Sequence, residues 1–342
     1  MKRFVIIDGN AILHRAFHAL PPLTTKNGEL INAVYGFTSM LLRVIDDLRP
    51  TYLAITFDRP KPTFRQTLYA GYQAHRPKMD EGLSSQIERV HEVVKTMGIP
   101  VFEVDGFEAD DVIGTLTGKI KDLPAGRQVK SEKIEAVVVT GDRDILQLVD
   151  RETKVCMPVK GLIETKIYGE KEVEEKFGIM PSQMVDYKSL VGDQSDGYPG
   201  VSGIGPKTAV NLLSRFRSLE ETYAHVGEIE NEKLRNTLAE NSDQAMLAKK
   251  LAEIVRDVPL SFRLEECKLP QLDSPEINKL FKELGFKSLI PRLSFANSSS
   301  ADEEEKYKEE ILANLEVKKS ILANLEVKKS KKKKDDKQIK LF

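Results

Sequence analysis

The chain has 342 residues, of which 40% are hydrophobic and 31% are charged, a composition typical of a globular protein with one large core or two smaller ones. Lys and Arg total 52 against 53 Asp and Glu, so the formal net charge of minus one excludes a general polycation, and any nucleic-acid surface must be local. No apolar run reaches the length of about 18 residues that spans a membrane, and Cys156 and Cys267 lack the spacing of a zinc site or a disulfide framework. We therefore expect a cytoplasmic protein.

The first part of the chain alternates β-branched runs with helical patterns. This order predicts an α/β domain with a mostly parallel central sheet over residues 1–170. Three of the β-branched runs, FVIID, YLAITFD and EAVVVTGD, end in Asp8, Asp58 and Asp142. Because the carboxyl ends of parallel strands form the ligand-binding edge of such sheets, these acids are candidate site residues.

Residues 59–82 follow the second of these runs and are too long and too patterned for a plain connection. The segment mixes cations with aromatic rings, a combination suited to a nucleic-acid single strand whose phosphates and bases are both contacted. A solvated basic loop is the alternative. We interpret the segment as an arch whose candidate DNA contacts are Arg65, Tyr72, Arg76 and Lys78.

Helical patterns dominate residues 171–297, which we expect to form a second, helical domain. Within it, the hairpin at 200–210 contains GIG directly before Pro206, and proline is favoured at the first position of a helix. Glycines allow close approach to a phosphate, which exposed amides and a helix N-terminus then bind. A tight turn between helices is the alternative. The candidate DNA-binding residues of the hairpin are Gly203, Gly205, Lys207 and Thr208.

Nine acids lie in strand-end or turn contexts and are the candidate catalytic and metal-binding residues. They are Asp8, Asp58, Glu108, Asp110, Asp111, Asp142, Asp144, Asp193 and Asp196. If they converge, each like-charged pair about 4 Å apart costs about 4 kcal/mol at an effective dielectric near 20, so divalent cations must compensate. Oxygen ligands favour Mg²⁺ or Mn²⁺, and two ions about 3.5 to 4 Å apart suit phosphodiester hydrolysis. Any single aspartate among them is explained equally well as a helix cap or a turn residue.

The EADD segment sets a geometric condition on this convergence. On an ideal helix, Glu108 and Asp111 share a face while Asp110 points away. All three acids can therefore converge only if the segment lies at the N-terminus of a helix.

These motifs, in this order, resemble those of the 5′-nuclease (flap endonuclease) family, and most closely the 5′→3′ exonuclease domain of bacterial DNA polymerase I. The resemblance covers about residues 1–293 and rests on IIDGNAILHRAFHAL, NAVYGFTSMLLRV, FEADDVIGTL, VTGDRDILQLV and VGDQSDGYPGVSGIGPKTA. It implies a PIN-like nuclease domain followed by a helix-three-turn-helix domain that binds duplex DNA and often a monovalent cation.

The resemblance also implies a site and an activity. Asp8, Asp58, Glu108 and Asp110, with Asp111 beside them, would form a first metal cluster, and Asp142, Asp144, Asp193 and Asp196 a second one. The expected activity is Mg²⁺-dependent removal of 5′ flaps and 5′-terminal nucleotides, including RNA primers, during DNA replication and repair. Mn²⁺ is the expected substitute for Mg²⁺.

Two departures from the family pattern leave alternatives open. The family usually carries lysine where this chain has Gln73, so Arg76 or Lys78 would have to supply the missing charge near the scissile phosphate. Nothing resembling a polymerase domain follows residue 293, and we expect a nuclease without one. The alternatives are a ribonuclease of the related metal-carboxylate fold and a catalytically silent protein that binds DNA junctions.

The C-terminal residues differ in composition from the rest. Residues 298–337 contain ILANLEVKKS twice in tandem and many charges, which predicts a disordered linker. Residues 338–342, QIKLF, resemble the bacterial sliding-clamp-binding pentapeptide, in which Gln338, Leu341 and Phe342 would fill a pocket on the clamp.

Overall fold

The computed structural model describes residues 2–122, 133–160 and 164–295. The linker and the pentapeptide predicted at 298–342 lie outside these residues. No helix in the described part of the chain has both the length and the apolar character needed to cross a membrane.

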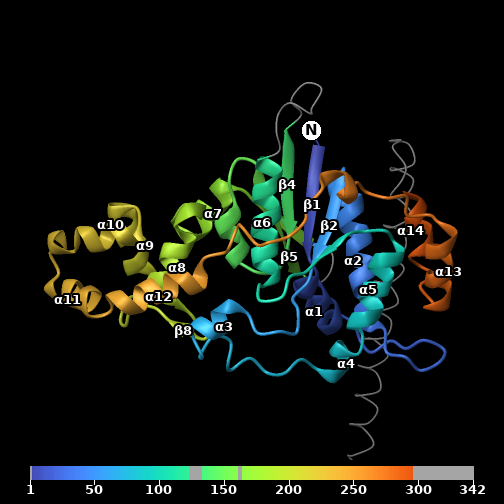
Figure 1. The fold of residues 1–342 in the computed structure, drawn as a ribbon, viewed down its shortest axis with the longest axis horizontal. Coiled ribbons are helices and arrows are strands. Elements are labelled where there is room, and N and C mark those ends of the chain that lie inside the picture. Colours follow the sequence, from blue (N-terminus) through green and yellow to red (C-terminus); the bar gives the residue numbers. More distant parts are fainter. Residues whose placement is uncertain (1, 123–132, 161–163, 296–342) are drawn as a thin grey trace, which may run out of the picture.

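A six-stranded sheet forms the centre of the molecule, in the order β3-β2-β1-β4-β5-β6 (Figure 1). Neighbouring strands are parallel except β5 and β6, which are antiparallel. The predicted α/β class with a mostly parallel sheet is confirmed. The strands are β1 (Lys2–Asp8), β2 (Tyr52–Thr56), β3 (Val101–Phe102), β4 (Ile134–Val139), β5 (Thr153–Lys160) and β6 (Glu164–Tyr168).

Helices cover both faces of the sheet, which explains why its central strands are almost continuously apolar. In β1, Val5 and Ile7 point into one core, while Phe4 and Ile6 point into the other. This alternation follows from the two-residue period of a strand. The first face is covered by α1 (Gly9–Ala19), α2 (Asn32–Leu48) and α5 (Ile87–Thr96), and the second by α6 (Ala109–Lys121).

The arch (residues 59–82) contains two short helices, α3 (Phe64–Leu68) and α4 (Glu81–Ser84). It runs below the sheet, from the end of β2 out to α3 beside β8 (Tyr198–Pro199) and back to α4 (Figure 1). Thr63 and Gln66 cap α3 reciprocally, and Asp80 caps α4 through the amide of Gly82. Between these helices the chain has irregular structure.

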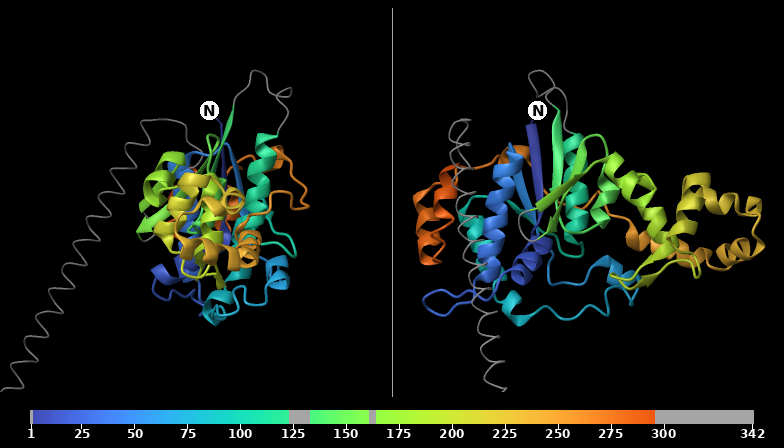
Figure 2. Two further views of the ribbon diagram at one scale, coloured as in Figure 1. Left: turned by 90° about the vertical axis from the view of Figure 1, so that its left-hand side faces the viewer. Right: turned by 180° about the vertical axis from the view of Figure 1, so that it is seen from behind.

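The second half of the chain is helical and extends to one side of the sheet (Figures 1 and 2). Its apolar side chains continue the core of the second sheet face without a break: Leu212 and Leu213 belong to the same cluster as Ile113 and Leu116. The main elements are α7 (Glu170–Phe177), α8 (Met184–Val191), the two-stranded pair β7 (Gly192–Asp193) and β8 (Tyr198–Pro199), α9 (Pro206–Phe216), α10 (Leu219–Ala224), α11 (Glu232–Glu240) and α12 (Ser242–Ala252).

The last two described helices differ from the expected helical domain over 171–297. α13 (Pro275–Glu283) and α14 (Ile290–Phe295) pack on α5 and α2, at the opposite end of the molecule from α9 to α12 (Figure 1). Phe281 and Phe286 are buried in the first core, and the Arg292 guanidinium lies 3.3 Å from the Asp46 carboxylate. These helices are therefore part of the α/β half, since their apolar faces find their partner there.

Candidate active site

Asp8 ends β1 and caps α1 at the carboxyl edge of the sheet. Its carboxylate accepts hydrogen bonds from the Ala11 amide at 3.0 Å and from the Thr140 hydroxyl at 2.6 Å. Thr140 directly follows β4, so this bond joins the ends of two neighbouring strands. Burial of Asp8 raises its pKa to about 6, because desolvation disfavours the ionised form.

Asp58 and Glu108 lie beside the start of α6. The Asp58 carboxylate accepts a 2.7 Å hydrogen bond from the Ala109 amide, the first amide of that helix. The Glu108 carboxylate accepts hydrogen bonds of 3.1 Å from both the Thr63 and the Tyr72 hydroxyls. Burial raises the pKa of both acids, that of Glu108 to about 7 although the Arg65 guanidinium opposes this shift.

Asp110 is in the first turn of α6, among the acids at the strand ends. Burial raises its pKa well above the usual range, and the charges of Asp142, Asp8, Asp144 and Asp58 add to this effect. The start of α6 thus brings Asp110 to the edge where β1, β2 and β4 end. We call Asp8, Asp58, Glu108, Asp110 and Asp142 the strand-end acids.

Asp111 does not join the strand-end acids. The EADD segment lies at the N-terminus of α6, with Glu108 as the N-cap, as the predicted convergence of its acids requires. Asp111 nevertheless points away from the other acids and forms a bidentate pair with Arg65 at 2.7 and 2.8 Å. The same carboxylate accepts hydrogen bonds from the amides of Glu108 and Val255. Its oxygens are therefore occupied within the protein, which differs from the expected metal contact.

Arg65 and Tyr72 also differ from their expected role as DNA contacts. Arg65 is 2% exposed and Tyr72 is 4% exposed. Beyond its pair with Asp111, Arg65 donates to the carbonyl oxygens of Leu251 and Glu253, and the Tyr72 ring stacks on that of Tyr198 at 6.3 Å. Both side chains are thus used to attach the arch to the rest of the protein.

Asp144, Asp193 and Asp196 form the closest group of acids. Among the residues described, this is the one set of three or more acids, histidines or cysteines whose ligand atoms all lie within 4.8 Å of one another. Asp142 is linked to the set because its carboxylate accepts a 2.9 Å hydrogen bond from the Asp144 amide. Three of the four acids expected in a second cluster therefore converge. We call Asp144, Asp193 and Asp196 the three-acid group.

Two basic side chains contact the three-acid group. The Lys188 ammonium contacts the carboxylates of Asp144 and Asp193, and Arg76 pairs with Asp196 at 2.7 Å. Burial opposes the charged form of Lys188, but Asp144 and its neighbours outweigh this effect and raise the lysine pKa. Sequence reasoning missed Lys188, because a single lysine in the helical segment DYKSLVGD carries no motif; its one signal is its position five residues before Asp193.

The predicted DNA-binding hairpin joins α8 to α9 through β7 and β8. Gly203 has a φ of +80°, a left-handed conformation that favours glycine, and α9 begins at Pro206. Lys207 in the first turn of α9 is exposed, as are Arg76 and Lys78 in the arch. The hairpin therefore presents a helix N-terminus and a cation to solvent.

The donor atoms of this region suit hard divalent cations. Every candidate ligand is a carboxylate oxygen, and burial together with mutual repulsion raises the pKa of Asp8, Glu108, Asp110 and Asp144. A divalent cation would relieve this repulsion, so these carboxylates fit a site for divalent cations.

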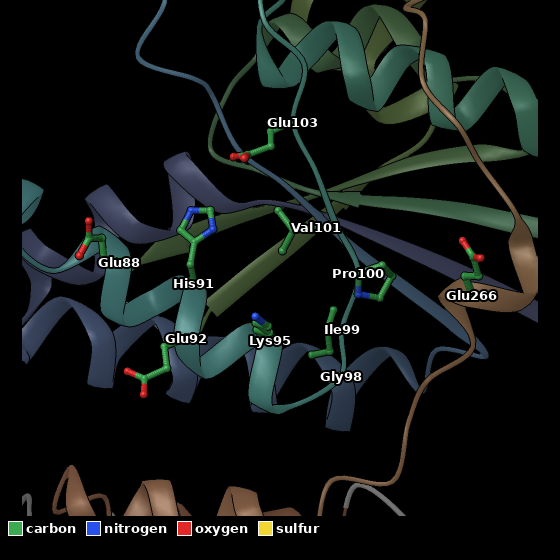
Figure 3. Close-up of a pocket in the computed structure, with 10 residues that line it drawn as sticks. All are labelled: Glu88, His91, Glu92, Lys95, Gly98, Ile99, Pro100, Val101, Glu103 and Glu266. Carbon is green, nitrogen blue, oxygen red and sulfur yellow. The ribbon is translucent and has the colours of Figure 1, made fainter.

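A groove of about 610 Å³ lies away from these acids, between α5 and the β3 edge of the sheet (Figure 3). Its walls include Glu88, His91, Glu92 and Lys95 of α5, and Glu266 faces them from the segment before α13. None of the residues predicted above lines it. This groove is thus separate from the candidate site.

A family model described as a 5′-3′ exonuclease N-terminal resolvase-like domain matches residues 3–178, and one described as a 5′-3′ exonuclease C-terminal SAM fold matches residues 179–275. The chain belongs to the 5′-3′ exonuclease family. The boundary between the two matches lies eight residues beyond the expected boundary at 170.

Individual relatives agree with this membership of the exonuclease family. The chain is 40% identical over 305 residues to DNA polymerase I of Bacillus caldotenax, which covers 89% of this chain and 33% of that protein. It is 35% identical over 308 residues to DNA polymerase I of Bacillus subtilis, and this match covers 90% of this chain and 34% of that protein. The chain thus spans about a third of the length of these relatives.

Solved structures show that the fold is shared more widely. The T5 D15 protein, crystallised with metal ions, has a TM-score of 0.61 at 17% identity, covering 83% of this chain and 99% of that one. The catalytic core of Rad2 in complex with DNA substrate has a TM-score of 0.50 at 18% identity, and the match covers 85% of this chain and 92% of that one. At these identities the likeness concerns the fold of the 5′-3′ exonuclease domain.

Proposed function

We propose that this protein is a Mg²⁺-dependent 5′→3′ exonuclease and 5′-flap endonuclease that hydrolyses phosphodiester bonds in primer removal and DNA repair. One observation carries the proposal: the strand-end acids lie close enough to the three-acid group that the charge of Asp144 acts on Asp110, beside an arch and a hairpin that carry exposed cations. Family membership supports the nuclease class.

Both sets of acids would hold the divalent cations. When bound, two such cations about 3.5 to 4 Å apart supply activation of the attacking water and stabilisation of the charge on the leaving oxygen. Around them, the chain itself binds and orients the substrate. The N-terminus of α9 and Lys207 would bind the phosphates of the duplex, and Arg76 would neutralise the phosphate that reacts.

The proposed substrate is nicked or branched DNA with a 5′ single strand, including the junction of an RNA primer with DNA. The arch supports this choice, because it runs below the sheet and carries exposed Arg76 and Lys78. Among the proteins of similar fold, the bacteriophage T5 D15 flap endonuclease has been crystallised in a pseudo-enzyme-product complex with DNA and metal ions.

Cleavage of a labelled 5′-flap duplex tests the proposal. The flap substrate and an unstructured RNA of equal length are incubated with Mg²⁺ or with a chelator, and Asp142→Ala serves as the control for contaminating nucleases. We expect Mg²⁺-dependent cutting near the flap junction by the wild type alone. Cutting of RNA alone would favour a ribonuclease, and binding without cutting in Mg²⁺ or Mn²⁺ would favour a silent junction-binding protein.

The proposed cytoplasmic partner is a bacterial sliding clamp, bound through Gln338, Leu341 and Phe342. This proposal depends on the sequence QIKLF alone. A flexible linker of about 40 residues would have an end-to-end span near 35 Å and would raise the local concentration of the nuclease at clamp-loaded DNA. Deletion of residues 338–342 is expected to abolish clamp capture in a pull-down, and unchanged capture would contradict the proposal.

A further inference from the structure

The base of the arch is docked on the loop that carries Asp196. The Gln73 amide donates a 2.7 Å hydrogen bond to the Asp196 carbonyl oxygen. His75 packs so closely on Gly197 that a Cβ at Gly197 would lie 2.6 Å from His75 Cε1. Together with the stacked rings of Tyr72 and Tyr198, these contacts align arch residues 72–76 with residues 195–198.

Two side chains of the arch meet at one atom of the three-acid group. Gln73 Nε2 lies 3.0 Å from Asp196 Oδ1, and Arg76 Nη2 lies 2.7 Å from the same oxygen. We call these two contacts the arch latch. Asp196 is also one of the three acids whose oxygens converge within 4.8 Å. These two hydrogen bonds occupy both lone pairs of Asp196 Oδ1, so a cation that binds this oxygen has to displace Gln73 and Arg76.

The backbone at Gln73 indicates that the surrounding contacts hold this conformation in place. Its φ is +55°, in the left-handed region that residues with a side chain seldom adopt. Such a conformation persists only where the surrounding structure determines it, and here the Asp196 contacts do so. Loss of those contacts would therefore loosen the arch base as well as free two side chains.

We propose that Asp196 exchanges between the arch and a divalent cation, so that filling of the three-acid group releases Gln73 and Arg76 and loosens the base of the arch. The inference rests on the proposed metal-dependent function. In it, Gln73 is a positioning residue, which acts on the metal site through Asp196. The Arg76 guanidinium, once released, becomes available to a DNA phosphate in the arch.

Hydrogen exchange of the whole protein without DNA tests the release directly. We expect amides in residues 71–80 to exchange faster with saturating Mg²⁺ than with a chelator, because the Gln73 amide loses its acceptor when the loop and the arch separate. Residues 87–96 of α5 provide the internal reference. Unchanged or slower exchange in 71–80 would overturn the proposal.

Thermodynamic linkage supplies a second test. If cation binding weakens the arch latch, a substitution that weakens the latch must in turn raise the affinity for the cation. Gln73→Met keeps the length and the zero charge of the side chain but removes its donor. In an Asp110→Ala background, which weakens cation binding by the strand-end acids, we expect Gln73→Met to raise the Mn²⁺ affinity of the three-acid group about fivefold. Lys78→Met, which removes an exposed charge from the same arch, is the matched control.

The outcomes separate this inference from the proposed function. An equal or larger gain for Lys78→Met than for Gln73→Met would assign the effect to general electrostatics and refute the latch. Wild-type protein that cuts flap DNA but shows neither metal-dependent exchange nor a Gln73→Met effect would refute the latch alone. Protein that shows both effects but cuts no flap DNA would contradict the proposed function and leave the latch supported.

Discussion

Asp110 and Asp111 are neighbours in the chain with opposite surroundings. Burial and then the charges of the surrounding acids raise the pKa of Asp110, whereas Asp111 is fully buried in a bidentate pair with Arg65. The difference arises because consecutive residues of a helix point about 100° apart, and the arch supplies the arginine on only one side. One side chain thus faces the other acids, and the other is paired within the protein.

This contrast predicts different outcomes for two alanine variants. Asp110→Ala relieves repulsion, so we expect an unchanged or higher melting temperature in chelator and a loss of flap cleavage of at least about 100-fold. Asp111→Ala leaves the Arg65 guanidinium buried without this partner, which costs about 3 to 5 kcal/mol of unfolding free energy and lowers the melting temperature. Calorimetry and flap cleavage on both variants check this, and an equal loss of stability in the two would contradict the assignment.

At the scale of the element, the proposed function assigns the duplex to the N-terminus of α9 and the 5′ single strand to the arch. α9 presents Lys207 in its first turn, and Gly203 gives the preceding loop its left-handed bend. Phosphate contacts of this kind position a duplex without reading its sequence. The hairpin should therefore determine affinity rather than the rate of the chemical step.

Lys207→Ala is expected to weaken binding of flap DNA uniformly across sequences and to reduce the slope of log affinity against log salt by about one. Single-turnover cleavage at saturating protein should stay near the wild-type rate. Lys282→Ala, an exposed cation on α13 at the other end of the molecule, is the control. An equal loss of affinity in both variants would show that general positive charge, not the hairpin, governs binding.

For the whole molecule, the buried acids make stability depend on pH. Burial raises the pKa of Asp8 to about 6 and those of Glu108 and Asp144 to about 7, above their unfolded values near 4. Between these limits the folded state holds more protons than the unfolded state, so the unfolding free energy falls as pH rises. The loss should level off above about pH 7, where the folded state has also released these protons.

We therefore expect the metal-free protein to melt at a higher temperature at about pH 5 than at about pH 7.5. Mg²⁺ should raise the melting temperature more at the higher pH, because it binds the ionised acids. Calorimetry in chelator and in Mg²⁺ at both pH values checks this, with Asp8→Asn as a variant whose pH dependence should be smaller. A metal-free melting temperature that rises with pH over this range would contradict the prediction.

Local sequence predicted the parts of the site that local structure determines. Asp8 and Asp142 were identifiable because β-branched runs ended next to them, and Pro206 marked the start of a helix. Lys188 and the partner of Asp111 were not identifiable, since both depend on contacts between distant segments. Arg65 lies 46 residues from Asp111, and no local pattern specifies that pairing.

The same limit applies to the last helices. The amphipathic pattern of residues 275–283 correctly indicated a helix with one buried face. It could not indicate which surface covers that face, and sequence proximity suggested the helical domain. The structure instead places Ile277 and Phe281 against the first core, because α2 and α5 leave an apolar surface there.

The packing of α13 and α14 on α5 and α2 has a consequence for folding during synthesis. Tyr35 bonds Ser288, and Leu269 donates to Thr51, so segments more than 200 residues apart complete the first core. At about 5 to 20 residues per second, the ribosome needs roughly 10 to 40 s to proceed from α5 to α14. During that time the apolar sides of α2 and α5 remain uncovered on the nascent chain. A chaperone that binds exposed apolar helices would therefore find its target in this early half until α14 emerges.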